Sequence, residues 1–123
     1  MKQGYSGIAR LRRAFMYSCY GLRAGWRFEE AFRLEVVLLV VLFIASFWVA
    51  QTLVEWIILI VSILQLMVVE LMNSAVEAVV DRIGTEHHEL SGRAKDLAAG
   101  AVMISIGITL LVWLAFIGVR LFG

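Results

Sequence analysis

The chain has 123 residues, which is enough for one domain. Hydrophobic residues make up 62% of it and charged residues 17%, a composition that excludes a disordered protein and is too apolar for an ordinary soluble domain. The net charge of +1 gives no argument for nucleic-acid binding. The single Cys19 excludes an internal disulfide and leaves the redox compartment open.

The N-terminal segment, residues 7–33, combines arginines with regularly spaced apolar residues. The apolar positions recur at spacings of three, four and seven, as on one face of a helix. This pattern predicts a basic amphipathic helix, about residues 6–29, that lies on an anionic membrane surface. A solvated helix that packs on its own protein is a compatible alternative. The apolar positions are Ile8, Leu11, Phe15, Leu22 and Trp26.

Three apolar segments follow, at residues 36–54, 56–80 and 97–119. A membrane-spanning helix needs about 20 apolar residues, so we expect spans at about 31–50, 54–82 and 96–121. The second segment reaches spanning length only if Glu70 and Glu77 are included. Buried helices of a soluble protein are the alternative, but too little polar chain remains to cover them. The sequence therefore predicts a single all-α membrane domain.

The distribution of basic residues predicts the topology. All but one of the 11 Lys and Arg residues lie in residues 1–33 and 81–96, and the connection at 51–55 has none. Because cytoplasmic segments carry the Lys/Arg excess, we expect a cytoplasmic N-terminus and a cytoplasmic second loop. A cleavable signal peptide is not expected, because the first long apolar run starts near residue 36.

The stretch ELMNSAVEAVVD, residues 70–81, places acidic residues inside an apolar region. At about 100° per residue, its polar side chains fall within a helical sector of about 100°. A charged side chain costs about 2.5–3.5 kcal/mol at the centre of a membrane helix, so this polar stripe is expected to face a partner helix, a cavity or a cation. Its members are Glu70, Asn73, Ser74, Glu77 and Asp81.

Two interpretations of the stripe remain open. Pairing with a basic residue, Arg23, Arg27 or Lys95, is favoured for Asp81, which lies at the charged end. Glu70 lies deeper in the apolar segment, where a divalent cation or a role as proton acceptor also fits two carboxylates seven residues apart. The spacing alone does not choose between them.

The remaining polar groups give weaker signals. Glu29 and Glu30 precede the first span, and simple helix-end charge is the first explanation for them. The loop TEHHEL contains His87 and His88, but neighbouring histidines rarely converge on one metal and no HExxH pattern is present, so zinc is not expected. The standard phosphate-binding loops are also absent.

Residues 70–96, ELMNSAVEAVVDRIGTEHHELSGRAKD, resemble the signature of the prokaryotic diacylglycerol kinase family of small membrane lipid kinases. The resemblance extends through YSCYGLRAGW (17–26), EEAFRLE (29–35), Trp48 and Trp113. It implies a homotrimer in the bacterial inner membrane, with three transmembrane helices and a surface helix per chain and no nucleic-acid partner. It also implies transfer of the ATP γ-phosphate to the primary hydroxyl of diacylglycerol, which gives phosphatidic acid.

The resemblance further implies roles for individual residues. Glu70 corresponds to the proton acceptor, Asn73 to an active-site polar residue, and Glu29 and Glu77 to the carboxylates that hold Mg²⁺ with ATP; Lys95 offsets phosphate charge. Positions that line the nucleotide are Arg10, Tyr17, Glu29, Glu77, Glu86, His87, His88, Lys95 and Asp96. Positions that contact the lipid substrate or the membrane interface are Arg10, Ser18, Arg23, Trp26, Ala31, Arg33, Glu35, Trp48, Trp56, Ala99 and Trp113.

Three departures from the family pattern concern the lipid acceptor. Phe28 and Leu34 replace polar residues, and Ala99 stands where many diacylglycerol kinases have serine. AKDLAAGAV resembles the related undecaprenol kinases, so undecaprenol is the alternative acceptor, although HHELSGRAKD and the long N-terminal helix favour diacylglycerol. A non-catalytic transporter or assembly subunit, with Glu70 as coupling carboxylate, is the remoter alternative; Glu29 and the loop cluster argue against it.

Overall fold

The computed structural model describes residues 6–123, so Lys2, one of the basic residues of the N-terminal segment, lies outside the described range. The described chain forms four helices, α1 (Gly7–Phe28), α2 (Glu30–Val49), α3 (Leu53–Ile83) and α4 (Glu89–Phe122). The three longest apolar segments lie in α2, α3 and α4, and each of these helices is long and apolar enough to cross a membrane. The predicted all-α class with three possible spans is therefore confirmed.

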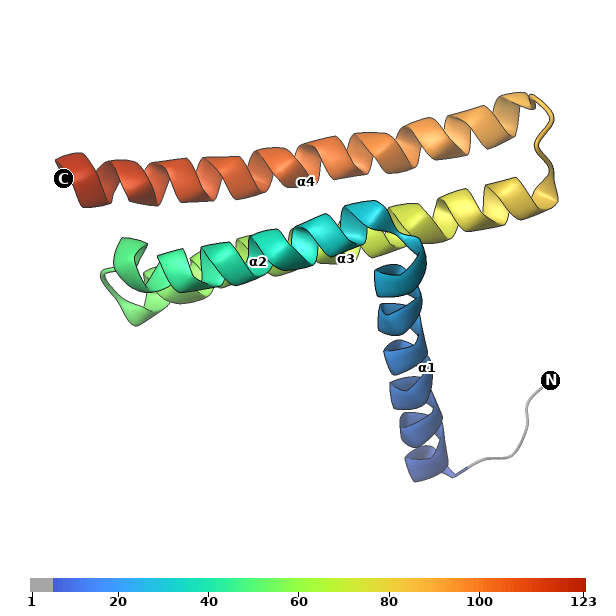
Figure 1. The fold of residues 1–123 in the computed structure, drawn as a ribbon, viewed down its shortest axis with the longest axis horizontal. Coiled ribbons are helices and arrows are strands. Elements are labelled where there is room, and N and C mark those ends of the chain that lie inside the picture. Colours follow the sequence, from blue (N-terminus) through green and yellow to red (C-terminus); the bar gives the residue numbers. More distant parts are fainter. Residues whose placement is uncertain (1–5) are drawn as a thin grey trace.

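Helix α1 lies crosswise to the other three helices (Figure 1). It starts at Ser6, whose hydroxyl accepts a hydrogen bond from the Ala9 amide at 3.4 Å, a common N-cap arrangement. It ends at Glu29, the single extended residue between α1 and α2. The Arg33 guanidinium donates to the carbonyls of Trp26 and Arg27 at 2.9 and 3.2 Å, which satisfies carbonyls in the last turn of α1.

The bend between α1 and α2 packs against the middle of α3. Gly25 is buried there, and a Cβ added to it would lie 3.2 Å from both Leu71 Cδ2 and Phe32 Cδ1. A Cβ at this position would be a tight contact, and a larger side chain would have to displace Leu71 or Phe32. The contact fixes the start of α2 and residue 71 of α3 at the level of α1.

Helices α2, α3 and α4 run lengthwise beside one another (Figure 1). Beyond the bend, α3 and α4 continue past α1 as a hairpin closed by residues 84–88. The loop residue His88 caps α4, because its Nδ1 accepts a hydrogen bond from the Leu90 amide at 3.1 Å. Helix α4 therefore begins at Glu89, well ahead of the apolar segment that starts at Leu97.

A polar network joins α3 to α4 in the apolar half of the bundle. The Gln65 amide donates to Ser105 O at 2.9 Å and to Thr109 Oγ1 at 3.2 Å, and Ser105 Oγ donates back to Gln65 Oε1 at 2.8 Å. Farther along the helices, Trp113 Nε1 donates to Ser62 Oγ at 3.1 Å. Hydrogen bonds of this kind hold membrane helices together where lipid leaves little hydrophobic driving force.

Few apolar side chains are buried within the single chain. One buried cluster lies beside the polar network and contains Val49, Leu59, Ile63 and Trp113. Most large apolar side chains of α2, α3 and α4 are exposed. Such surface suits contact with lipid or with other copies of the chain.

Candidate functional site

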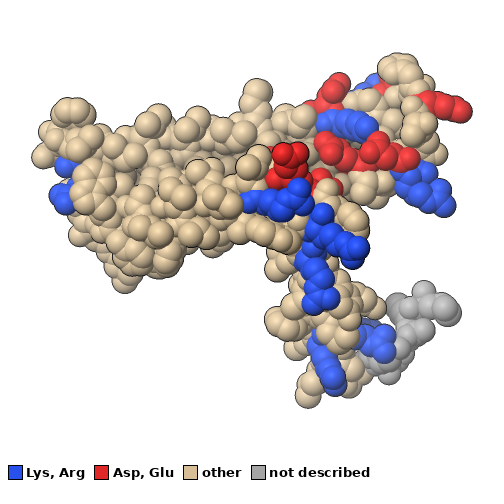
Figure 2. All heavy atoms as spheres, viewed as in Figure 1, with Lys and Arg blue, Asp and Glu red and all other residues tan. Residues whose placement is uncertain are grey.

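The polar stripe of α3 lies where the bundle becomes charged. Figure 2 shows acidic side chains gathered near the α1–α2 bend and along the projecting α3–α4 hairpin, whereas α1 carries exposed arginines. Within the stripe, Asn73 Nδ2 donates to Glu77 Oε1 at 3.3 Å. Asn73 Oδ1 is buried and accepts no hydrogen bond from the described residues, so this amide keeps one unused acceptor.

The two interpretations of the stripe apply to different carboxylates. Lys95 Nζ lies 2.8 Å from Asp81 Oδ1, so the predicted pairing of Asp81 with a basic residue is confirmed, and Lys95 is its partner. In residues 6–123 the other ion pair joins Arg93 to Glu89, and neither ion pair involves Glu70 or Glu77. Neutralisation by a basic side chain therefore accounts for the charge of Asp81 in this stripe but not for the carboxyl group of Glu70.

Glu70 instead meets a second carboxyl group. The carboxyl group of Glu35, on α2, lies beside that of Glu70 on α3. Glu35 Oε2 is buried and has no partner of its own. The family resemblance placed Glu35 only among the positions that contact the lipid substrate or the membrane interface and gave no sign of this pairing. The one available signal was a carboxylate in the first turns of an apolar helix, which is costly unless it has a partner.

A cavity of about 700 Å³ separates α1 from α3. Small residues on both helices leave it open, among them Gly21 and Ala78. It contains Ser18 and Glu29 of the predicted site together with Ser74 of the stripe. Glu77 does not line it, so the two carboxylates expected to hold a metal do not share this cavity in a single chain.

A second hollow, of about 500 Å³, lies at the closed end of the α3–α4 hairpin. It brings together Glu86, His87, His88 and Lys95, four of the residues expected to line a nucleotide. Asp96 follows Lys95 on α4 but does not line the hollow. Because His88 Nδ1 accepts a hydrogen bond, Nε2 carries the proton of a neutral imidazole and can donate to a ligand.

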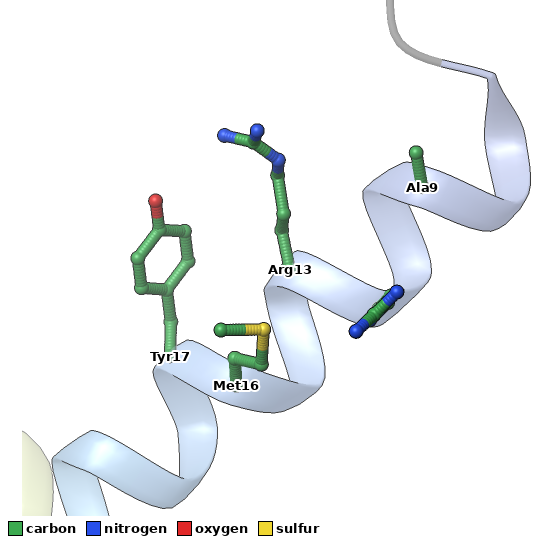
Figure 3. Close-up of a pocket in the computed structure, with 5 residues that line it drawn as sticks. Ala9, Arg13, Met16 and Tyr17 are labelled. Atoms are coloured by element: carbon green, nitrogen blue, oxygen red, sulfur yellow. The ribbon is translucent and has the colours of Figure 1, made fainter.

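A groove of about 530 Å³ follows the outer face of α1. Arg13 and Tyr17 extend from the same side of the helix, with Met16 beside Tyr17 (Figure 3). Tyr17 was expected to contact the nucleotide, yet within one chain it lines this groove and not the hollow of the α3–α4 hairpin. Arg10 is also on α1 and lines neither hollow.

Three of the four tryptophans carried over as lipid contacts, Trp48, Trp56 and Trp113, lie toward the end of the bundle away from the α1–α2 bend. Trp56 is fourteen residues before Glu70 on α3, roughly 21 Å away at 1.5 Å per residue. Its Nε1 donates to Ser46 Oγ at 2.9 Å, and Trp48 accepts a hydrogen bond from Arg120 at its carbonyl at 3.0 Å. The other lipid-contact positions lie on α1, at the start of α2 and on α4: Arg23, Trp26, Ala31, Arg33 and Ala99.

Comparisons with known proteins identify relatives along most of the chain. A family model described as prokaryotic diacylglycerol kinase matches residues 16–117. The diacylglycerol kinase of Escherichia coli K12 is 44% identical over 113 residues, which cover 92% of this chain and 93% of that protein. The diacylglycerol kinase of Haemophilus influenzae is 46% identical over 108 residues, with 88% and 92% covered. That of Helicobacter pylori 26695 is 39% identical over 107 residues, with 87% and 84% covered.

The three spans and these matches together define a membrane-embedded kinase. The chain belongs to the prokaryotic diacylglycerol kinase family. The matched region contains the whole α3 stripe, the Glu35–Glu70 pair and the loop at residues 84–88.

Proposed function

We propose that the chain is an ATP-dependent diacylglycerol kinase that transfers the ATP γ-phosphate to the primary hydroxyl of diacylglycerol. Family membership supports the reaction class. The observation that carries the residue assignment is the position of Glu70, which forms no ion pair within residues 6–123 and lies next to Leu71, at the level of α1. With α1 on the membrane surface, Glu70 would lie just below the headgroups, at the depth of a diacylglycerol hydroxyl.

Phosphoryl transfer asks a protein mainly for positioning and for stabilisation of charge. The lipid hydroxyl oxygen forms a bond to the γ-phosphorus, and the bond from that phosphorus to the β–γ bridging oxygen breaks. ADP leaves, and the hydroxyl proton passes to the Glu70 carboxylate as general base. Phosphatidic acid is the product.

The hollow at residues 84–88 is the proposed nucleotide site. It lies on the hairpin that projects past α1 (Figure 1) and carries charged side chains (Figure 2), and a water-soluble substrate would enter there. Lys95 has three ammonium protons, so its ion pair with Asp81 leaves donors for phosphate oxygens. Glu86, His87 and His88 are further proposed nucleotide contacts in the hollow. Arg10, Tyr17 and Asp96 are proposed contacts that do not line it within one chain.

Glu29 and Glu77 are the proposed Mg²⁺ ligands. In the described residues, no group of three or more His, Cys, Asp or Glu side chains is arranged around a common point. A site with two carboxylates still fits Mg²⁺, which commonly takes one or two of them and completes its octahedron with substrate phosphates and water. Asn73 holds the Glu77 carboxylate by donating to it. Bound Mg²⁺ would neutralise phosphate charge.

The proposed placement puts α1 on the cytoplasmic surface of the bacterial inner membrane. The apolar residues that defined its periodicity are strongly exposed: Ile8 is 81%, Leu11 73% and Phe15 71% accessible. Exposed apolar residues between arginines favour the interface of an anionic membrane. The basic residues of α1 and of the hairpin favour a cytoplasmic position for both.

A homotrimer is the proposed assembly. Its support is the separation, within one chain, of Tyr17 from the hollow at residues 84–88, together with the exposed apolar surface of the spans. In an oligomer, Tyr17 of a neighbouring copy could lie at this hollow. Co-reconstitution of an inactive Tyr17→Ala protein with an inactive Lys95→Met protein tests this, because regained activity requires a site built from two chains.

The test of function measures phosphate transfer from MgATP in mixed micelles, with diacylglycerol and undecaprenol offered side by side. Wild-type protein should prefer diacylglycerol, and Glu70→Gln should lose transfer while retaining ATP binding. Glu55→Gln is the matched control, because it makes the same change at the other end of α3. Undecaprenol preference would move the function to polyprenol phosphorylation, and transfer to neither lipid by folded protein would contradict a kinase role.

A further inference from the structure

The carboxyl groups of Glu35 and Glu70, two acidic side chains from different helices, lie side by side. Their level is fixed by packing, because Phe32, one turn before Glu35, and Leu71, next to Glu70, both approach Gly25. The pair is therefore held by the same contacts that set α2 against α3. The relative position of the two carboxyl groups is thus set by helix packing.

No described basic side chain neutralises the pair. Arg33, the nearest arginine in sequence to Glu35, directs its guanidinium to the carbonyls of Trp26 and Arg27. Lys95 is engaged with Asp81. Within residues 6–123, the ion pairs thus leave the Glu35–Glu70 contact without a counter-ion.

The closeness of the two groups favours a shared proton. Two ionised carboxylates offer only acceptors and repel each other, so protonation of one carboxyl group relieves the repulsion and supplies a hydrogen-bond donor. Glu35 Oε2 is buried without a partner. An unpartnered buried oxygen costs much less when its group is neutral than when it is charged, so the burial of Oε2 favours the neutral form of Glu35.

We propose that Glu35 is a positioning residue, whose protonated carboxyl group donates to one oxygen of the Glu70 carboxylate and leaves the other oxygen free for the lipid hydroxyl. This inference rests on the proposed function. In the reaction, the free oxygen of Glu70 takes the hydroxyl proton as the new O–P bond forms, and the pair then holds two protons. One of them leaves to water before the next turnover, which restores the starting state.

The first test compares two substitutions at Glu35. Glu35→Gln keeps an N–H that can donate to Glu70, and should keep kcat within about threefold of wild type, whereas Glu35→Leu removes the donor and should lower kcat by about 10²-fold, as a misplaced catalytic group does. KM for MgATP should be unchanged in both. Glu30→Leu, at an exposed position of the same helix, is the matched control. Equal damage by Gln and Leu, or no damage by either, would overturn the proposal.

The second test does not depend on activity. Infrared spectroscopy of wild-type protein in lipid at neutral pH should show the C=O stretch of a protonated carboxyl group, which should disappear in Glu35→Gln and persist in Glu55→Gln. An active wild-type protein without this band would overturn the shared proton and leave the kinase function standing. A wild-type protein with the band but without transfer to any lipid would overturn the proposed function and, with it, the positioning role.

Discussion

Gln65 provides the sharpest prediction about stability. It makes three hydrogen bonds to α4, by donating to Ser105 O and Thr109 Oγ1 and by accepting from Ser105 Oγ. Interhelical hydrogen bonds in a membrane protein average about 0.6 kcal/mol each, so Gln65→Leu should cost up to about 2 kcal/mol. The loss is cushioned, because Thr109 Oγ1 still donates to Ser62 O at 2.8 Å. We expect a net destabilisation of about 1–2 kcal/mol, close to tenfold in the unfolding equilibrium.

The assay is equilibrium unfolding in mixed micelles of increasing SDS content, followed by tryptophan fluorescence. Trp113 is a built-in reporter, because its indole bonds to Ser62 beside the network. Leu64→Met, at the neighbouring exposed position, changes no hydrogen bond and serves as control. A double-mutant cycle with Ser105→Ala isolates the shared bonds, which should make the two losses less than additive. A Gln65→Leu protein as stable as wild type would refute the view that this network holds α3 to α4.

Three further predictions concern the site and its supports. Lys95→Met should abolish most phosphate transfer, and Asp81→Asn should reduce it less. The unfolding midpoints of both variants should change little, because the ion pair between the two residues is partly exposed. Similar losses of activity in both variants would argue that the ion pair, and not the Lys95 ammonium alone, supports transfer. Gly25→Leu should displace Phe32 or Leu71 and destabilise the protein by about 1–3 kcal/mol, whereas Gly25→Ala should be mild, as SDS titration would reveal. Arg120→Gln should loosen the end of α4 from α2 and speed hydrogen exchange there without lowering kcat, since it removes the donor to the Trp48 carbonyl.

The local features of this protein were predictable because they depend on periodicity. The apolar segments indicated three spans, and angular spacing placed Glu70 and Asp81 on one face of α3. Asp81, at the charged end, was expected to find a basic partner, and Lys95 is that partner. Each of these inferences depends only on the residue spacing within one helix or on the distribution of charged residues along the chain.

Contacts between helices were not predictable in the same way. Nothing in residues 30–50 says which side chain of α3 will face Glu35, because that depends on how two helices cross. Gln65 looked like an isolated polar residue in an apolar segment until α4 supplied Ser105 and Thr109. The start of α4 was also hidden, because hydropathy marks the apolar segment and not the capped turn at His88.

The junction between α1 and α2 has a mechanical consequence. Glu29 alone departs from helical geometry there, with φ −114° and ψ 107°. With one residue as the joint, any tilt of α1 relative to the spans must turn the backbone that carries the Glu29 carboxylate. The tilt of α1 and the direction of the Glu29 carboxylate are thus coupled through this one residue. A change in that tilt would also re-aim an acidic group that lines the cavity between α1 and α3.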